Sequence, residues 1–115
     1  MDFALTEEQE MIRESAENFL ADVSSSAAVR EAMQTEQGYD QQVWQRICEE
    51  MVWPAIHIPE AYGGMGLGYV ELAVLLEKMG KYLLCSPYFS TVCLGVNSLL
   101  MAGNEQQKAD YLPKI

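Results

Sequence analysis

Hydrophobic side chains recur every three or four residues along the first part of the chain, with acidic residues between them. This spacing puts the apolar residues on one face of an amphipathic helix. Thr6 and Gln9 precede the pattern at the separation of a capping box, and Glu7 and Glu8 would complement the helix dipole. The sequence therefore predicts a first helix that begins after Thr6. Its apolar face consists of Ile12, Ala16, Phe19, Leu20 and Val23.

Two shorter helices are predicted before the middle of the chain. The first spans Ala27 to Met33, with Ser26 near its amino-terminal cap. Asp40 is a suitable cap for the second. Because the residue before a proline is forced out of the helical region, this helix is expected to end at Trp53-Pro54. Its apolar face consists of Val43, Ile47 and Met51, with Trp44 and Cys48 beside it.

A dense glycine cluster lies in the middle of the chain, directly before an almost continuous apolar run. Four of the eight glycines fall between Gly63 and Gly68, among aromatic and aliphatic residues. Glycine reaches positive φ and lets other groups approach the backbone closely, so this composition indicates a packed loop and not a flexible linker. The apolar run predicts a helix from Tyr69 to Lys81 that is buried on more than one side, with a Glu77–Lys81 ion pair near its end.

Ser86-Pro87 has the character of a helix start, because proline is tolerated at the first helical position. The helix that follows is expected to run to about Met101 and to end at Gly103. Asn104 and Gln107 then open a sixth short helix. No segment alternates strictly between apolar and polar residues, so the fold class is all-α, a bundle of about six helices. The inward residues of the fifth helix are predicted to be Phe89, Val92, Cys93, Val96, Leu99 and Leu100.

Composition narrows the class of protein. A length of 115 residues, half of them hydrophobic, fits a single domain over residues 1–115 with one core. The formal net charge of −10 argues against a nucleic-acid partner and against anionic membrane surfaces. No apolar run reaches about 18 residues, so no membrane span is expected. An acidic amino terminus without a signal peptide, and three cysteines without a pairing pattern, predict a cytoplasmic protein with reduced thiols.

The candidate catalytic and ligand-binding residues are better interpreted as structural residues. The glycines from Gly64 to Gly68 have the spacing G-x-G-x-G, but a dinucleotide-binding loop needs a preceding strand, and no Gly-Lys-Ser/Thr follows. His57, the only histidine, has no Ser, Cys or carboxylate nearby at a spacing typical of a catalytic site. A packed or partly exposed histidine is therefore favoured over a general base or a metal ligand. Glu60 and Glu71 are interpreted as exposed or ion-paired charges. We therefore predict no catalytic, cofactor-binding or metal-binding residue.

Three separated segments carry a resemblance to a known family. They are Met1–Gln9, then Ile58–Gly68 continuing through Glu71–Gly80, and finally Ala102–Lys108 with Tyr111–Pro113. In this order they resemble the first helix, the central loop and helix, and the last turn and helix of the amino-terminal helical domain of acyl-CoA dehydrogenases. The resemblance covers essentially the whole chain.

The resemblance implies a flavin enzyme. In this family a glutamate removes the α-proton of an acyl-CoA and FAD accepts the β-hydride, which gives a trans-2-enoyl-CoA. An electron-transfer flavoprotein normally takes the electrons onward, and the enzymes are homo-oligomers or mixed-subunit complexes. The family's glutamate lies in a carboxyl-terminal helical domain, and the flavin is held chiefly by that domain and a middle β-domain. No position here matches either, so these 115 residues alone are expected to be inactive and free of flavin.

The resemblance also places part of the acyl pocket in this chain. Counting back from the turn at Ala102, the positions that match the family's pocket wall are Ser90, Thr91 and Leu94. Each buried methylene contributes about 0.8 kcal/mol, so such a wall sets chain-length preference. The two hydroxyl residues suit a roomy or polar-tipped pocket. The alternative is that they are ordinary surface hydroxyls and that Leu94 belongs to the core.

Substrate subclass and enzyme class stay open at this stage. The stretch Gly80–Leu83, leading into Pro87–Thr91, is similar to family members that act on larger acyl-CoAs, including sterol side chains, as mixed-subunit complexes. An acyl-CoA oxidase shares this domain but gives electrons to oxygen. A non-catalytic helical subunit or interaction module is the alternative from another class. It predicts a well-covered polar surface, whereas the enzyme predicts an apolar face left bare on the domain.

Overall fold

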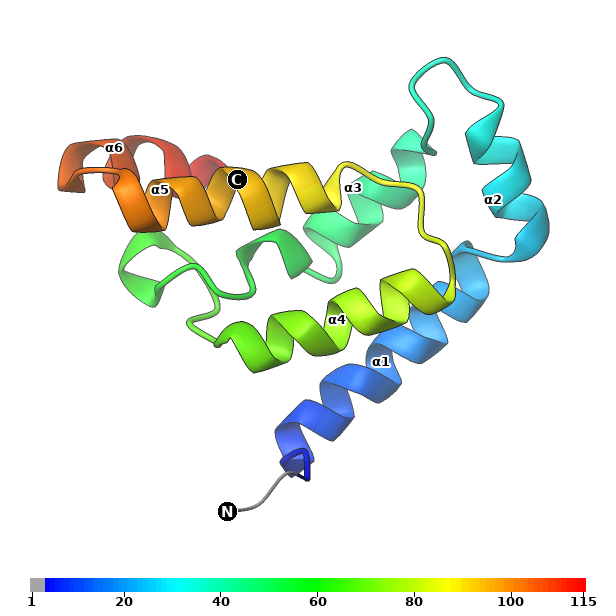
Figure 1. The fold of residues 1–115 in the computed structure, drawn as a ribbon, viewed down its shortest axis with the longest axis horizontal. Coiled ribbons are helices and arrows are strands. Elements are labelled where there is room, and N and C mark those ends of the chain that lie inside the picture. Colours follow the sequence, from blue (N-terminus) through cyan, green and yellow to red (C-terminus); the bar gives the residue numbers. More distant parts are fainter. Residues whose placement is uncertain (1–3) are drawn as a thin grey trace.

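The computed structural model describes residues 4–115, and all regular structure in this range is helical (Figure 1). The predicted all-α bundle of about six helices is confirmed. The molecule is flat, with extents of 43 × 40 × 20 Å. Residues 1–3 of the segment Met1–Gln9 lie outside the described residues.

The α-helices are α1 (Glu7–Val23), α2 (Ser26–Met33), α3 (Gln41–Glu49), α4 (Tyr69–Lys81), α5 (Asn97–Ala102) and α6 (Glu105–Tyr111). Short 3-10 helices are η1 (Trp53–Ala55), η2 (Glu60–Tyr62) and η4 (Leu112–Lys114), and a π-helix, η3 (Phe89–Val96), leads into α5. Within the described range, none of these helices is long and apolar enough to cross a membrane.

Side-chain caps fix the starts of the first three helices. The capping box predicted at Thr6 is present. Helix α2 begins one residue earlier than predicted, because Ser25 and not Ser26 is its cap, with an Oγ that accepts from the Ala28 N–H at 3.2 Å. Asp40 caps α3 as predicted. Three of these helix ends therefore follow from local chemistry that the sequence displays.

Helix α3 ends at Glu49, before the predicted stop at Trp53-Pro54. Val52 has a φ of 55°, in the left-handed region, so the helical path is broken before the proline acts. Residues 53–58 are then buried in succession although they form only a 3-10 turn and bends. This segment does not form a strand. It runs through the interior, where the Trp53 ring packs edge-on against Phe19 with 5.3 Å between centroids.

Helix α4 packs chiefly against α1, and Figure 1 shows the two side by side. Glu17 of α1 forms ion pairs with Lys78, at 3.0 Å, and with Lys81, at 2.7 Å. The predicted Glu77–Lys81 pair is therefore wrong, because the Lys81 ammonium reaches across to the neighbouring helix. Burial on more than one side is confirmed: Val74 is buried in addition to the stripe formed by Leu72, Leu75 and Met79.

The core has two parts. The larger joins α1, α3, α4 and the start of η3, and the smaller joins the segment after Trp53 to the carboxyl-terminal helices. The larger cluster includes Ala16, Phe19, Leu20, Ile47, Trp53, Ile56, Leu72, Leu75, Met79, Tyr88 and Val92; the smaller includes Ala55, Ile58, Val96 and Leu112.

The fifth predicted helix exists, but its first half is the π-helix η3. A π-helix has a longer repeat than an α-helix, so the buried positions fall four residues apart. The prediction that Phe89 faces inward is wrong for this reason: its side chain is 61% exposed and Tyr88 is buried instead. Gly103 ends α5 as predicted, in an extended conformation, and an added Cβ there would lie 2.5 Å from the Leu99 carbonyl oxygen.

Candidate functional site

The three predicted pocket residues lie on η3, and Ser90 and Leu94 lie on the side of it that faces away from the core. Leu94 is 55% exposed, so the alternative that it belongs to the core is wrong. Ser90 is also exposed and Thr91 is half-buried. Ser90 and Leu94 are four residues apart and share a side of the helix. The opposite, buried stripe consists of Tyr88, Val92 and Val96.

The start of η3 is fixed by short-range hydrogen bonds. The Ser86 Oγ accepts from the Tyr88 N–H at 3.3 Å, which is the capping role predicted for this serine. The Ser90 hydroxyl donates to the Pro87 carbonyl at 3.0 Å. The proton of Ser90 is therefore committed to the backbone, while its oxygen still has lone pairs for a donor on a ligand.

Tyr88 anchors this helix to the interior. Its side chain is 1% exposed, and its hydroxyl donates to the Trp53 carbonyl at 2.9 Å. Burial raises the pKa of the Tyr88 hydroxyl, so the group remains a neutral donor. The sequence did not single out this residue, because a 3.6-residue repeat favours its neighbour Phe89 for the inward position.

A polar cluster holds the other end of η3. The Asn97 Oδ1 lies 2.7 Å from the His57 Nε2 and accepts from the Tyr69 hydroxyl at 3.3 Å, while the Asn97 Nδ2 donates to the Cys93 carbonyl at 3.0 Å. His57 is 6% exposed, so the prediction of a packed histidine is confirmed. None of these contacts supplies a carboxylate or a nucleophile to the ring. The cluster can therefore position groups, but it is not a proton relay.

A cavity of about 240 Å³ opens at the start of η3, against the second half of α4. Its walls are mostly apolar, so it suits the end of a hydrocarbon chain or ring. Leu83 lies at this cavity with a φ of 53° and a side chain that is 70% exposed. Sequence reasoning missed the cavity because the turn between two helices builds it. Its lining consists of Leu76, Met79, Gly80, Leu83, Leu84, Ser86, Tyr88 and Phe89.

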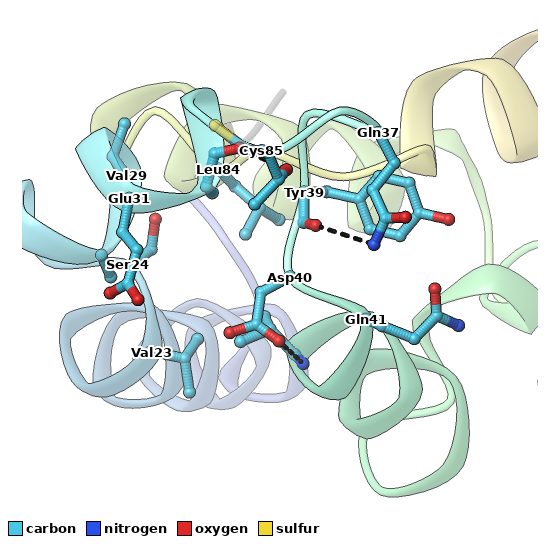
Figure 2. Close-up of a pocket in the computed structure, with 14 residues that line it drawn as sticks. Val23, Ser24, Val29, Glu31, Gln37, Tyr39, Asp40, Gln41, Leu84 and Cys85 are labelled. Carbon is cyan, nitrogen blue, oxygen red and sulfur yellow. Dashed lines mark hydrogen bonds between the residues drawn. The ribbon is translucent and has the colours of Figure 1, made fainter.

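A second hollow, of about 250 Å³, lies where the end of α1, helix α2 and the loop before α3 meet (Figure 2). Val23, Val29 and Leu84 give it apolar walls, and Glu31 and Asp40 carry carboxylates there. The Asp40 Oδ1 already accepts from the Gln42 N–H at 2.8 Å as a helix cap. No group of three or more potential metal-ligating side chains occurs in residues 4–115. This hollow displays no catalytic arrangement.

The glycine loop is fully occupied by its own packing. The five successive N–H groups from Gly63 to Leu67 all donate to backbone carbonyls of residues 55–60. A Cβ on Gly64 would lie 2.0 Å from the Ile58 carbonyl oxygen, so the two segments touch. A phosphate cradle needs free N–H groups, and the N–H groups from Gly63 to Leu67 are all used. The segment from Gly63 to Leu67 therefore does not fit the phosphate of a flavin or dinucleotide, and the loop serves packing, as predicted.

Comparison with known proteins gives the family. The family profile described as "Acyl-CoA dehydrogenase, N-terminal domain" matches residues 6–115. The chain belongs to the acyl-CoA dehydrogenase family. Acyl-CoA dehydrogenase IpdE2 of Mycolicibacterium smegmatis is 36% identical over 102 residues, covering 89% of this chain and 32% of that protein. Mitochondrial isovaleryl-CoA dehydrogenase of Pongo abelii is 32% identical over 115 residues, covering 96% and 26%.

Solved structures agree with this acyl-CoA dehydrogenase assignment. A variant of the Tcur3481-Tcur3483 steroid ACAD superposes with a TM-score of 0.84 at 27% identity, over 95% of this chain and 29% of that one. The ChsE4-ChsE5 complex from Mycobacterium tuberculosis shares the fold, with a TM-score of 0.82 at 24% identity over 98% of this chain and 32% of that one. This chain therefore corresponds to about a quarter to a third of the length of these acyl-CoA dehydrogenase relatives.

Proposed function

We propose that the chain serves as the amino-terminal domain of a flavin-dependent acyl-CoA dehydrogenase and that Ser90, Thr91 and Leu94 form part of its acyl pocket. One observation supports the assignment of the site: Ser90 and Leu94 are exposed on η3, and Phe89 of the same helix lines an apolar cavity of about 240 Å³. A bound acyl tail would cover side chains that the domain leaves exposed.

The reaction of the complete enzyme removes a proton from the α-carbon and a hydride from the β-carbon of an acyl-CoA. We assign the FAD and the base to parts of the protein other than these 115 residues, because the glycine loop is filled by its own hydrogen bonds. Electron-transfer flavoprotein is the proposed electron acceptor, and the working assembly is a homo-oligomer or a mixed-subunit complex. The three cysteines are unpaired, and we place the enzyme in the cytoplasm.

A large or ring-bearing acyl group is the proposed substrate class. The side chains at Ser90 and Thr91 are small and hydroxylated, which leaves space beside Leu94. The similarity to a structure of a steroid ACAD variant, at 27% identity, supports the same class. Isovaleryl-CoA dehydrogenases also match this chain, so short branched acyl-CoAs are the substrates to compare.

Two other functions make different predictions. An acyl-CoA oxidase would transfer electrons to oxygen and form hydrogen peroxide without an electron-transfer flavoprotein. A non-catalytic helical subunit would have polar surfaces suited to solvent. The exposed side chains of Leu83, Phe89 and Leu94 do not match that second description. They favour a domain that packs against other parts of an enzyme.

The test uses the complete enzyme with Leu94→Trp, which fills the space beside η3. We expect kcat/KM for a ring-bearing acyl-CoA to fall about tenfold relative to a short branched one, because the larger side chain excludes the bulkier tail. Met33→Trp changes a residue on α2 that is 68% exposed and should leave the ratio unchanged. An unchanged ratio in Leu94→Trp would remove this face from the pocket. Peroxide formation with oxygen as sole acceptor would identify an oxidase.

A further inference from the structure

The π-helix η3 has an unusual length. It spans eight residues, whereas π geometry normally appears as a single turn inside an α-helix, often at functional sites. The N–H of Asn97 shows the altered pairing, because it donates to the Val92 carbonyl, five residues back, as well as to the Leu94 carbonyl. In an α-helix that N–H would instead meet the Cys93 carbonyl, four residues back.

In this pairing the Cys93 carbonyl does not accept from the Asn97 N–H, and it bonds to the side chain of Asn97 instead. Its Nδ2 donates to the Cys93 carbonyl at 3.0 Å, the bond that the backbone N–H of the same residue would make in an α-helix. Asn97 thus stabilises the π pairing at the carboxyl-terminal end of η3. A side chain without an amide donor would leave the Cys93 carbonyl open to the ordinary α-helical bond.

His57 ties this residue to the interior. The amide oxygen of Asn97 only accepts, so the His57 Nε2, 2.7 Å away, is the donor of this hydrogen bond. The other ring nitrogen, Nδ1, is buried and has no hydrogen-bond partner among the residues that the structure describes. Within residues 4–115, the hydrogen bond of the ring therefore goes to Asn97, and it connects the buried segment 53–58 to the end of η3. Tyr69 adds a third contact from the start of α4 at 3.3 Å.

We propose that Asn97, anchored by His57, is a positioning residue that holds η3 in its π form and so sets which side chains face the acyl pocket. The inference rests on the proposed function. A return to α-helical pairing would shorten the repeat and rotate Ser90 and Leu94 about the helix axis relative to α5. The pair therefore controls substrate selectivity without touching the substrate.

The experiment uses the complete enzyme with Asn97→Leu, which keeps a similar volume and removes all three hydrogen bonds. We expect the ratio of kcat/KM between a ring-bearing and a short branched acyl-CoA to change about tenfold. A crystal structure should show the N–H of residue 97 bonded to the Cys93 carbonyl. Ser98→Ala, an exposed neighbour on α5, is the matched control and should keep the parent ratio.

A second pair of variants covers the case in which Asn97→Leu does not fold. His57→Gln retains an amide N–H that can reach the Asn97 oxygen, whereas His57→Leu has no donor. We expect His57→Gln to keep the parent selectivity and π pairing and His57→Leu to lose both. Equal selectivity in these two variants, or π pairing that persists in His57→Leu, would overturn the positioning role, whatever happens to thermal stability.

Failure of the proposed function is recognised separately. If the complete parent protein dehydrogenates no acyl-CoA, the proposed function is wrong. The backbone pairing in crystals of the His57 and Asn97 variants then still decides whether these two residues hold the π geometry.

Discussion

Gly64 is needed because two backbone segments touch, not because of a left-handed conformation. Positive φ occurs at Gly63 and Gly66, whereas the constraint at Gly64 is the Ile58 carbonyl oxygen, 2.0 Å from a built Cβ. We expect Gly64→Ala to lower stability by about 2 kcal/mol through overpacking, or roughly 10 °C in thermal midpoint. Gly80→Ala is the control, because a Cβ there meets nothing within 4 Å in a helix that favours alanine. Equal midpoints for parent and Gly64→Ala would contradict the close contact.

Val52 carries backbone strain. A β-branched residue with a φ of 55° is disfavoured by about 1–2 kcal/mol, and this side chain is 41% exposed, so little burial offsets the strain. Val52→Asn should therefore raise the thermal midpoint by a few degrees, about 1 kcal/mol of stability, because asparagine tolerates this region. Val70→Asn makes the same chemical change at an exposed helical position and should raise nothing. A lower midpoint for Val52→Asn, measured by calorimetry, would show that the valine packs usefully.

For single residues, the sequence predicts interactions between groups that are close together along the chain. The caps at Thr6 and Asp40 follow from a side chain and an N–H two or three residues apart, so no tertiary information is needed. The partner of Lys81 could not be found in the same way. The ammonium has a choice between Glu77 on its own helix and Glu17 on another, and only the packing of α1 on α4 decides it.

At the scale of elements, the sequence locates η3 but not its geometry. Apolar residues from Phe89 to Leu100 are spaced closely enough to satisfy a 3.6-residue repeat or a longer one. Tyr88 and Asn97 hold the two ends of η3, because they bond to the buried segment that contains Trp53 and His57. The two hydrogen bonds join residues that are 35 and 40 positions apart in the sequence. The inward position of Phe89 was therefore predicted wrongly.

The contact between α1 and α4 should depend on pH through Glu17. Hydrogen bonds from Lys81, Tyr82 and Lys78 lower the pKa of its carboxyl from 4.5 to about 2. Since the folded-state pKa lies below the unfolded value, the carboxylate stabilises the fold above about pH 4.5, and this contribution is lost as pH falls towards 2. Glu17→Gln should lower the thermal midpoint at neutral pH, with a difference from the parent that shrinks across this window.

The matched control for this prediction is Glu14→Gln, which removes the same charge from an exposed position on the same helix. Its midpoint should follow the parent at all pH values apart from a small effect of net charge. A Glu17→Gln difference that stays constant from pH 6 to pH 2 would mean that the ion pairs with Lys78 and Lys81 do not hold the two helices together.

For the whole molecule, burial is uneven. The two core clusters account for the inner faces of the helices, while several large apolar side chains between α4 and α5 remain in solvent. The apolar excess in this half of the sequence predicted that face, and the family resemblance placed Ser90, Thr91 and Leu94 on it. The cavity at the start of η3 was not predicted, because its walls come from a turn whose path depends on the left-handed Leu83.

An exposed apolar face of this kind predicts self-association of the 115-residue chain. Phe89 is 61% exposed and Leu94 55%, and a contiguous patch of such residues is unusual on a monomer. Sedimentation velocity should show concentration-dependent association that the double substitution Phe89→Ser, Leu94→Ser reduces, because the apolar area removed from water in the contact is smaller. Met33→Ser, at a residue 68% exposed on α2, is the control and should associate like the parent. If the double variant also associates like the parent, the contact between copies lies elsewhere on the chain. Self-association would then give no support for a docking role of the η3 face.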